Sequence, residues 1–403
     1  MTEKHNHRLA DIHGASRLAI EATLALTSLV EAMHHTIARA PAILDTPTPG
    51  PTSGIIGMVY GNIRRVTHLV SASLEALLAQ GSSLASEQHS SPDRDMLLAA
   101  LNGAVGDHLA ATSNPLAIRM HLRLNGQPLD RRAQTQTAGL AQPSGKILVL
   151  VHGLCLNDRH WQRMGHDHGA LLAGDLGYTP VYLRYNTGLH ISANGRAFAD
   201  QLEGLLRDWP APVEELAIIG HSMGGLVARS ACHYGALADH AWLQQLRSMI
   251  FLGTPHHGAP LERGGNALQA MLGISPYTAA FARLGKIRSA GITDLRYGNL
   301  LDEDWHSRDR FTHTGDRRQP VPLPEGVECY AIAATTGATL GDLRDQLIGD
   351  GLVPLHSALG EHSDPALTVP FSDARRWVGS RMGHLDLLDR HDVYEQMRRW
   401  LTT

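Results

Sequence analysis

Residues 216–225 read LAIIGHSMGG, an apolar run followed by a serine between glycines, and this stretch decides the fold. The run Leu216–Ile219 has the length of a buried strand, and the pattern that follows the serine is helical. A serine between Gly220 and Gly224 indicates a sharp strand-to-helix turn that exposes its hydroxyl at the carboxyl end of the strand. The N-terminus of the following helix offers backbone N–H groups where negative charge would develop. Ser222 is therefore predicted to be a nucleophile.

Strands and helices alternate on both sides of this turn. Residues 146–151 read KILVLV, a continuous apolar run typical of a strand buried on both faces of a parallel sheet. Asn125-Gly126 predicts a hairpin turn between two short strands. The other expected strands are Thr179–Leu183, Met249–Leu252, Cys329–Ala333 and Arg376–Val378, and the expected helices are Asn194–Trp209, Met223–Tyr234 and Val393–Leu401. The alternation predicts an α/β fold, a mostly parallel sheet covered by helices on both faces.

Two long segments depart from this alternation. Residues 1–114 have helical periodicity, including a third helix that is expected to begin at Pro92, and we expect them to form an N-terminal helical region. Residues 115–403 then form the catalytic domain. Residues 258–324 are too long for an ordinary connection and carry the helical patches Ala267–Leu272 and Tyr277–Leu284, which predicts a lid insertion.

A serine at its ordinary pKa is a weak nucleophile, so a base is required farther along the chain. His384, in residues 382–386 (MGHLD), lies between the last expected strand and the closing helix. A loop there can return a histidine to the carboxyl edge of the sheet, and His384 is the predicted base. The rival histidines, each less well placed, are His256, His257, His356 and His362.

The predicted acid is Asp350, in residues 349–354 (GDGLVP), because it follows an expected strand on a glycine-rich turn. The same glycines would also suit a purely structural Asx-turn. Competing carboxylates are Asp342, Asp345 and Asp386. The chain order Ser, Asp, His agrees with one of the known triad topologies.

The oxyanion hole is expected at the end of the strand 146–151. Gly153 lets the backbone turn so that the N–H of Leu154 can point at the substrate oxygen, and the N–H of Met223 is the expected second donor. His152 is interpreted as a hydrogen-bonding residue that orders the loop, and Cys155 as a small buried apolar residue.

Composition excludes several classes of protein. The chain has 403 residues and a net charge of −4, which gives no electrostatic reason to expect a nucleic-acid partner. Its three cysteines lie far apart, so neither a disulfide framework nor a thiolate metal site is expected. Residues 1–10 show no signal sequence, and no run approaches the roughly 18 apolar residues of a membrane span. A cytoplasmic location is expected, the oligomeric state stays open, and nothing requires a cofactor.

Five motifs together resemble the α/β-hydrolase superfamily, and within it the triacylglycerol-lipase-like and PGAP1-like esterases. These are VHGL (Val151–Leu154), GHSMGG (Gly220–Gly225), FLGTPHHG (Phe251–Gly258), DGLVP (Asp350–Pro354) and GHLDLL (Gly383–Leu388). The resemblance covers about residues 116–403. It implies Ser222, Asp350 and His384 as the triad, and Leu154 and Met223 as oxyanion donors. Because some lipases of this branch bind calcium through an aspartate at the place of Asp386, that residue is a possible ligand, although an ordinary loop aspartate is the preferred interpretation.

The leading hypothesis is a serine hydrolase that cleaves small-molecule or lipid acyl esters through an acyl-enzyme. An acyltransferase, or an amide or polyester hydrolase, would use the same triad. A non-catalytic binding protein on this fold, with the helical region as its working part, is the third hypothesis. Whichever hypothesis holds, residues 1–114 could cover the catalytic domain, drive oligomerisation or meet a lipid surface, and a packing surface is the preferred interpretation.

Overall fold

A computed structural model describes residues 11–18, 92–129, 143–259, 289–306, 315–338 and 349–402. The chain divides into two compact units, Met1–Ser90 with Ala111–Leu116 and Ser91–Ala110 with Ala117–Thr403. In the first unit the described residues include a helical segment, 11–18, where Asn114 donates a hydrogen bond to the carbonyl of Gly14 (3.1 Å). All the predicted site residues belong to the second unit.

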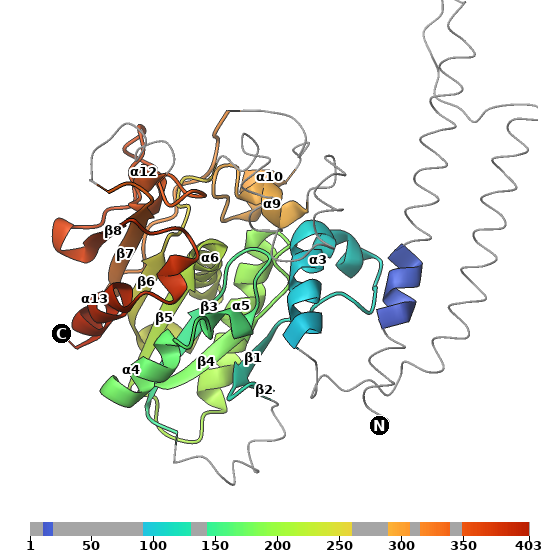
Figure 1. Cartoon of the computed structure of the whole chain (residues 1–403), viewed down its shortest axis with the longest axis horizontal. Helices are drawn as coiled ribbons and strands as arrows, with labels where there is room; N and C mark the ends of the chain where they lie inside the picture. The colour runs from blue at the N-terminus through green and yellow to red at the C-terminus, as the bar shows by residue number, and fades with distance from the viewer. Residues whose placement is uncertain are drawn as a thin grey trace, which may run out of the picture. The chain divides into compact units, whose positions relative to one another are not determined.

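The second unit is built on an eight-stranded sheet with the order β2-β1-β4-β3-β5-β6-β7-β8 (Figure 1). Its strands are β1 His121–Leu124, β2 Gln127–Pro128, β3 Lys146–Val151, β4 Thr179–Arg184, β5 Glu215–His221, β6 Leu246–Leu252, β7 Glu328–Thr335 and β8 Arg376–Ser380. Strands β4, β3, β5, β6, β7 and β8 pair in parallel, and β1 pairs antiparallel with both β2 and β4. The mostly parallel sheet and the hairpin at Asn125-Gly126 are thus confirmed.

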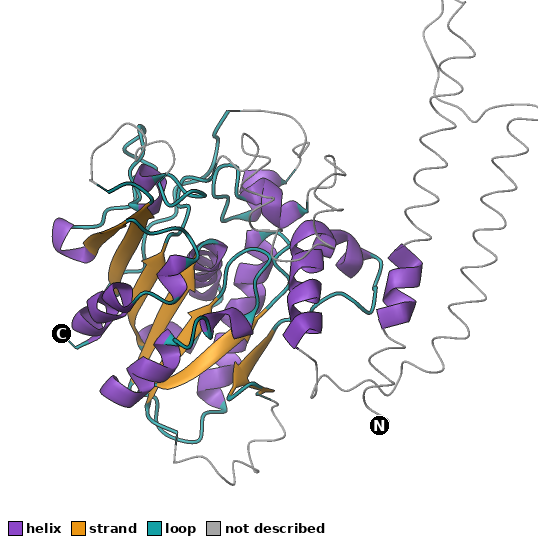
Figure 2. Ribbon diagram, viewed as in Figure 1, coloured by secondary structure: helices purple, strands orange, loops and turns teal. Residues whose placement is uncertain are grey.

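Helices cover both faces of this sheet, as Figure 2 shows. They are α3 Pro92–Ala111, α4 His168–Leu176, α5 Ile191–Arg207, α6 Met223–Leu237, α9 Ala290–Asp294, α10 Asp302–Trp305, α12 Leu355–Ala358 and α13 His391–Leu401, with short 3-10 turns at Asp158–Trp161, Ala241–Gln244, Asp373–Arg375 and Asp386–Leu388. Helices α5 and α6 pack on one face, and α4 and α13 pack on the other.

Strand β3 explains why both faces must be covered. Its side chains alternate between two separate cores, because Val149 packs in the core of α5 and α6 while Leu150 packs in the core of α4 and α13. Both side chains are fully buried. Each such aliphatic side chain stabilises the fold by about 1.5–3 kcal/mol. The continuous apolar run in the sequence is therefore the direct consequence of a sheet with two covered faces.

Helix α3 belongs to the unit of the sheet and not to the segment before it. The apolar stripe expected for α3 is Leu98, Leu101, Val105 and Leu109. Val105 and Leu109 are buried, whereas Leu98 and Leu101 are only partly buried. The small residues Gly103 and Gly106 are buried as well. Asp95 of α3 forms ion pairs with Arg159 and Arg184 (2.8 and 3.0 Å). Small residues, together with the second half of the apolar stripe, therefore pack α3 against the loops that follow β3 and β4.

Several predictions lie outside the described residues. These are the helical seams before residue 92, the patches Ala267–Leu272 and Tyr277–Leu284 of the expected lid, and the linker 130–142. The described parts of the interval 258–324 contain α9 and α10. None of the described helices combines the length and the apolar character that crossing a membrane requires.

Candidate active site

Ser222 occupies the turn between β5 and α6, with φ 55° and ψ −126°. This backbone conformation is rarely adopted by residues other than glycine, and here the flanking elements impose it. The N–H of Ser222 donates to the carbonyl of Leu252 (2.8 Å), which ties the turn to the end of β6. The predicted strand–turn–helix around the serine is confirmed.

The glycines of this motif are required by close contacts. A Cβ on Gly220 would lie 2.5 Å from the Cα of Gly225, and a Cβ on Gly224 would lie 2.2 Å from the carbonyl oxygen of Val151. Real Cβ atoms do not approach other heavy atoms so closely, so α6 could not begin this near to β5 and β3 with larger residues. The small residues therefore set the position of Ser222 at the sheet edge.

His384 and Asp350 form a buried pair. The Nδ1 of His384 lies 2.6 Å from Oδ2 of Asp350, and both side chains are almost inaccessible, at 2% and 1% exposed. The other oxygen, Oδ1, accepts the N–H groups of Leu352 and Val353 (3.0 and 2.8 Å). The Asx-turn that the glycines suggested is therefore present, and the same carboxylate also holds the imidazole.

This bond leaves the second ring nitrogen of His384 available. Because Nδ1–H donates to a carboxylate, Nε2 is the nitrogen without a proton in the neutral ring. Nε2 is buried and has no hydrogen-bond partner within the described part of the chain. A neutral Nε2 can accept a proton from a hydroxyl group.

Contacts from neighbouring loops bring the pair to the edge of the sheet at which Ser222 lies. A Cβ on Gly253, directly after β6, would lie 3.1 Å from Oδ2 of Asp350 and 3.2 Å from Cε1 of His384. His221, which precedes the serine, donates from Nε2–H to the carbonyl of His384 (3.1 Å), and the two rings are 4.7 Å apart. Burial lowers the pKa of His221 well below its ordinary value, so it stays neutral and keeps this bond.

The two expected oxyanion donors belong to segments next to Ser222. Met223 is the first residue of α6, and a Cβ on Gly153 would lie 2.9 Å from the Cβ of Ser222. Across the residues that the structure covers, no hydrogen bond from the N–H of Leu154 or Met223 is found. The next residue, Cys155, has φ 60° and donates its N–H to Oγ1 of Thr187 (3.2 Å), which fixes the loop.

His152 and Cys155, on either side of Gly153 and Leu154, have the structural roles that the sequence indicated. Nδ1 of His152 bonds the carbonyl of Gly153 (3.0 Å), and its ring stacks on Tyr185 at 4.4 Å. Burial lowers the pKa of His152 to about 3, so the ring is neutral. Cys155 is 3% exposed, and burial raises the pKa of its thiol to about 12. A thiol with that pKa is inert at neutral pH.

The rival histidines are engaged elsewhere. His256 is fully buried against Arg229, and His257 and His362 lie ring to ring at 4.9 Å. His356 lies on α12. Of the competing acids, Asp386 accepts the N–H of Gly383 through Oδ2 (2.8 Å), and Asp342 and Asp345 lie outside the described residues.

Asp386 is also the residue considered as a possible calcium ligand. Its carboxylate closes the turn that carries His384, and this is the role of an ordinary loop aspartate. No group of three or more histidine, cysteine, aspartate or glutamate side chains that could hold a metal ion occurs among the residues described.

Sequence reasoning missed the role of one residue in the site and one histidine–carboxylate pair outside it. It did not assign a part to His221, although the position of this residue in the turn was a signal that its ring would lie next to the base. It also missed a second histidine–carboxylate pair, His190 and Asp294 (3.0 Å), because these residues are far apart in the chain.

Comparison with known proteins supports the resemblance. Residues 142–321 match the family model described as PGAP1-like alpha/beta domain. This range contains the turn of Ser222 and ends before Asp350 and His384. The resemblance to PGAP1-like proteins is confirmed over these residues, and the mostly parallel eight-stranded sheet agrees with the predicted α/β-hydrolase fold. No match was found among curated proteins.

Solved structures with a similar fold include a lipase of Bacillus licheniformis in its mature form, 18% identical, with 66% of this chain and 95% of that chain covered and a TM-score of 0.42. Lipase B of Aspergillus fumigatus is 10% identical, with 98% and 85% covered and a TM-score of 0.41. An esterase of Pyrococcus furiosus is 13% identical, with 65% and 82% covered and a TM-score of 0.37.

Proposed function

We propose that the protein is a serine hydrolase that cleaves carboxylic esters, with Ser222 as nucleophile, His384 as base and Asp350 as orienting acid. The observation that carries the proposal is the buried 2.6 Å contact between His384 and Asp350 next to the strained turn of Ser222, with Nε2 of the histidine unoccupied. A buried carboxylate that fixes a histidine tautomer has a recognised use, which is to prepare Nε2 to accept a proton.

In the first half of the reaction, Oγ of Ser222 attacks the ester carbonyl while its proton passes to Nε2 of His384. The imidazolium that results is stabilised by the carboxylate of Asp350. The tetrahedral intermediate then collapses: the bond from the carbonyl carbon to the alcohol oxygen breaks, and the alcohol leaves with the proton from Nε2. An acyl group remains on Ser222.

In the second half, water attacks the acyl-enzyme and His384 takes its proton. Collapse of the second intermediate returns that proton to Oγ and releases the carboxylic acid. The N–H groups of Leu154 and Met223 donate to the negative oxygen in both intermediates. Removing one such donor from comparable sites costs about 10²–10³ in kcat.

An acyl ester, small or lipid, is the substrate class that we favour within this proposal. The structures with a similar fold include lipases and esterases, and residues 258–324 are proposed as a lid. Residues 1–114 are proposed as an appended helical region and residues 115–403 as the catalytic domain. Transfer of the acyl group to another acceptor would use the same residues, and analysis of the products with a competing alcohol distinguishes it from hydrolysis.

Turnover of a chain-length series of p-nitrophenyl acyl esters tests the proposal. Ser222→Ala should lower kcat at least about 10⁴-fold, since the nucleophile is lost. Ser248→Ala is the matched control, because Ser248 lies on the neighbouring strand β6 and is 8% exposed. A fluorophosphonate probe should label Ser222 alone, as located by mass spectrometry. Unchanged turnover in Ser222→Ala, or labelling elsewhere, would contradict the proposal.

A further inference from the structure

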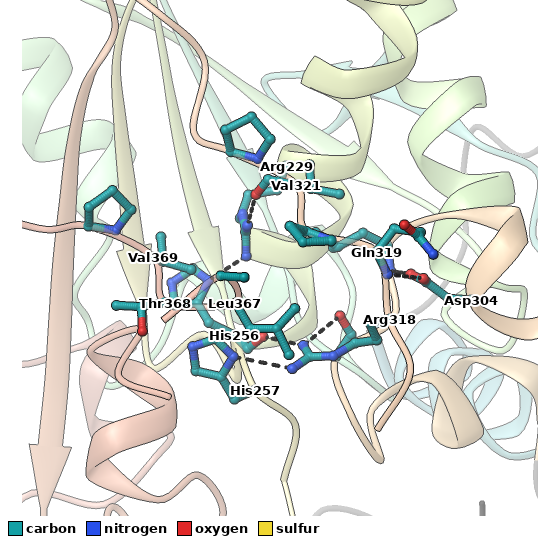
Figure 3. Close-up of a pocket in the computed structure, with 16 residues that line it drawn as sticks. Arg229, His256, His257, Asp304, Arg318, Gln319, Val321, Leu367, Thr368 and Val369 are labelled. Atoms are coloured by element: carbon teal, nitrogen blue, oxygen red, sulfur yellow. Dashed lines mark hydrogen bonds between the residues drawn. The ribbon is translucent and has the colours of Figure 1, made fainter. Parts of the chain in front are cut away.

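A cavity of about 230 Å³ lies away from the predicted triad, between the loop after β6 and two later segments of the chain (Figure 3). None of the predicted triad residues lines it. Its walls come from α6, from the His256–His257 turn, from residues 298–304 and 318–322, and from residues 366–370. It is smaller than the roughly 300–1,000 Å³ cavities that hold drug-sized ligands, which favours a ligand of only a few heavy atoms.

Arg229 is the unusual group in its wall. The residue is 5% exposed, yet no carboxylate pairs with its guanidinium within the described part of the chain. One nitrogen donates to Nδ1 of His256 (3.2 Å) and another to the carbonyl of Val321 (2.5 Å), while Nε has no partner. Burial and the nearby Arg318 lower the pKa of Arg229 to about 10, so it is still charged at pH 7. A buried and unpaired cation is costly unless an anion joins it.

The other charged groups around the cavity already have partners, either an ion pair or hydrogen bonds. Arg318 pairs with Asp316 (2.8 Å) and donates to the carbonyl of His256 (2.8 Å), as Figure 3 shows in part. The carboxylate of Asp304 also lines the cavity, and it accepts three backbone N–H groups at 2.9–3.0 Å. Arg229 is therefore the cation at the cavity whose charge is left without a counter-ion.

The two histidines add no charge. Because arginine can only donate, Nδ1 of His256 must accept, so this ring is neutral with its proton on Nε2. Burial lowers the pKa of His256 well below its ordinary value and that of His257 to about 4.

We propose that this cavity binds a small monocarboxylate with a short apolar chain, its carboxylate paired with Arg229. The spare donors belong to one guanidinium, which suits two carboxylate oxygens and is too few for a phosphate group. Three prolines, which lack an N–H, and several aliphatic side chains form much of the remaining wall: Leu300, Pro320, Pro322, Leu367, Val369 and Pro370. That surface fits the apolar chain.

Calorimetric titration of the full-length protein at pH 7 tests the proposal, with butanoate as the probe. Butanamide has nearly the same shape without the charge, and inorganic phosphate has charge without the apolar chain. We expect saturable binding of butanoate at least tenfold tighter than that of butanamide or phosphate. Arg229→Met should remove the preference for the charged ligand. Ser222→Ala should bind butanoate as the wild type does, since the cavity is separate from the serine.

A second variant keeps the test valid if Arg229→Met does not fold. Leu367→Trp should fill the cavity and weaken butanoate binding at least tenfold while Arg229 stays in place. Equal binding of butanoate and butanamide, tighter binding of phosphate, or no saturable binding of butanoate would overturn the proposal. The proposal does not rest on ester hydrolysis, because butanoate binding is measured without any turnover.

Discussion

Two histidine–carboxylate pairs in the same unit have the same contact and different surroundings. Nδ1 of His384 lies 2.6 Å from Oδ2 of Asp350, and Nδ1 of His190 lies 3.0 Å from Oδ2 of Asp294. Both aspartates are buried, at 3% and 1% exposed. By the contact between ring and carboxylate alone, each pair could orient a base.

The surroundings of the second pair, His190 and Asp294, indicate a structural role. The ring of His190 stacks flat on Trp305 at 3.7 Å, and its side chain is 22% exposed. Asp294 also accepts the N–H of Ile191 (2.8 Å), so its charge lies at the N-terminus of α5, where the helix dipole favours it. The pair thus joins α9 to the start of α5.

The difference between the pairs is the environment of the second ring nitrogen. Nε2 of His384 is buried without a partner, next to the turn of Ser222, whereas His190 faces an indole ring. A histidine–carboxylate bond therefore marks a candidate base only when the opposite nitrogen faces a group that can give up a proton. Four experiments test whether the two pairs differ in this way.

The largest effect is expected from removing each histidine. His384→Ala should lower kcat for acyl ester hydrolysis by about 10⁴-fold or more, because no other group can take the serine proton. His190→Ala should leave kcat within about threefold. Steady-state kinetics on one p-nitrophenyl ester measures both. Comparable losses in the two variants would show that the pairs do not differ as we infer.

The next largest difference is expected between variants of the two aspartates. Asp350→Asn should lower kcat by about 10³- to 10⁴-fold, because an amide cannot hold the imidazole in the required tautomer. Asp294→Asn should spare kcat and lower the free energy of unfolding by about 1 kcal/mol, because both oxygens of Asp294 accept hydrogen bonds and an amide has only one oxygen to accept them. Urea unfolding and kinetics on both variants test this. A kinetic defect without a stability defect in Asp294→Asn would refute it.

A smaller effect on kcat is expected from a substitution at Gly103 in α3, which contacts α9 on one side and the loop of Leu154 on the other. Ser289, which caps α9, donates to the carbonyl of Gly103 in α3 (2.6 Å). A Cβ on Gly103 would lie 2.2 Å from Sγ of Cys155, directly after the expected donor Leu154. Gly103→Ala should therefore displace the loop and lower kcat up to about 10²-fold with little change in KM, the signature of a weakened oxyanion donor.

Two further variants control this experiment. Gly174→Ala in α4 changes the same residue type in a helix where a Cβ meets nothing within 4 Å, and it should leave kcat unchanged. Adding Cys155→Gly to Gly103→Ala removes the clashing sulfur and should restore part of the lost activity. A double variant no better than the single one would speak against the contact as the cause.

The smallest effect is expected from acid. An unfolded His152 binds a proton below about pH 6.5, whereas burial holds the pKa of the folded residue to about 3. The unfolded state then binds more protons, so stability falls as the pH drops from 6.5 toward 3. At 1.36 kcal/mol per pH unit, His152 accounts for a loss of about 2 kcal/mol between pH 6.5 and 5.

His152 belongs to neither pair, and Asp294 of the second pair should respond to acid in the opposite direction. Burial raises the pKa of Asp294, so the folded state binds the extra proton there and acid near its pKa favours folding. Urea unfolding at pH 6.5 and 5 tests the contribution of His152. The loss in His152→Gln should be smaller than in the wild type by about 2 kcal/mol, and equal losses would show that His152 does not carry it.

Local patterns predicted the framework well. The strand 146–151 was found at its observed bounds, because a strand buried on both faces leaves an unbroken apolar run. Ser222 was placed at a strand-to-helix turn for a similar reason, since Gly220 and Gly224 lie too close to other backbone atoms to carry a side chain. Helix α4, nine residues long, was not predicted, and of the apolar stripe predicted for helix α3 only Val105 and Leu109 lie on its buried face. Short helices and packing of small residues leave weak periodic signals.

The candidate site was only partly accessible from the sequence. Asp350 and His384 were chosen for their places after expected strands, but that choice could not show that Asp350 also closes its own turn. Nothing local pointed to His190 and Asp294, or to the unpaired charge of Arg229. Each depends on residues brought together from distant parts of the chain.

Side-chain periodicity and glycine requirements act over a few residues, so the sequence alone was enough to identify the strands and the serine that lies in the turn. The tertiary structure alone decided which histidine–carboxylate pair leaves a nitrogen free beside that serine, and which buried arginine lacks a counter-ion. Those properties depend on burial and on neighbours that are remote in sequence, so no short stretch of residues contains them.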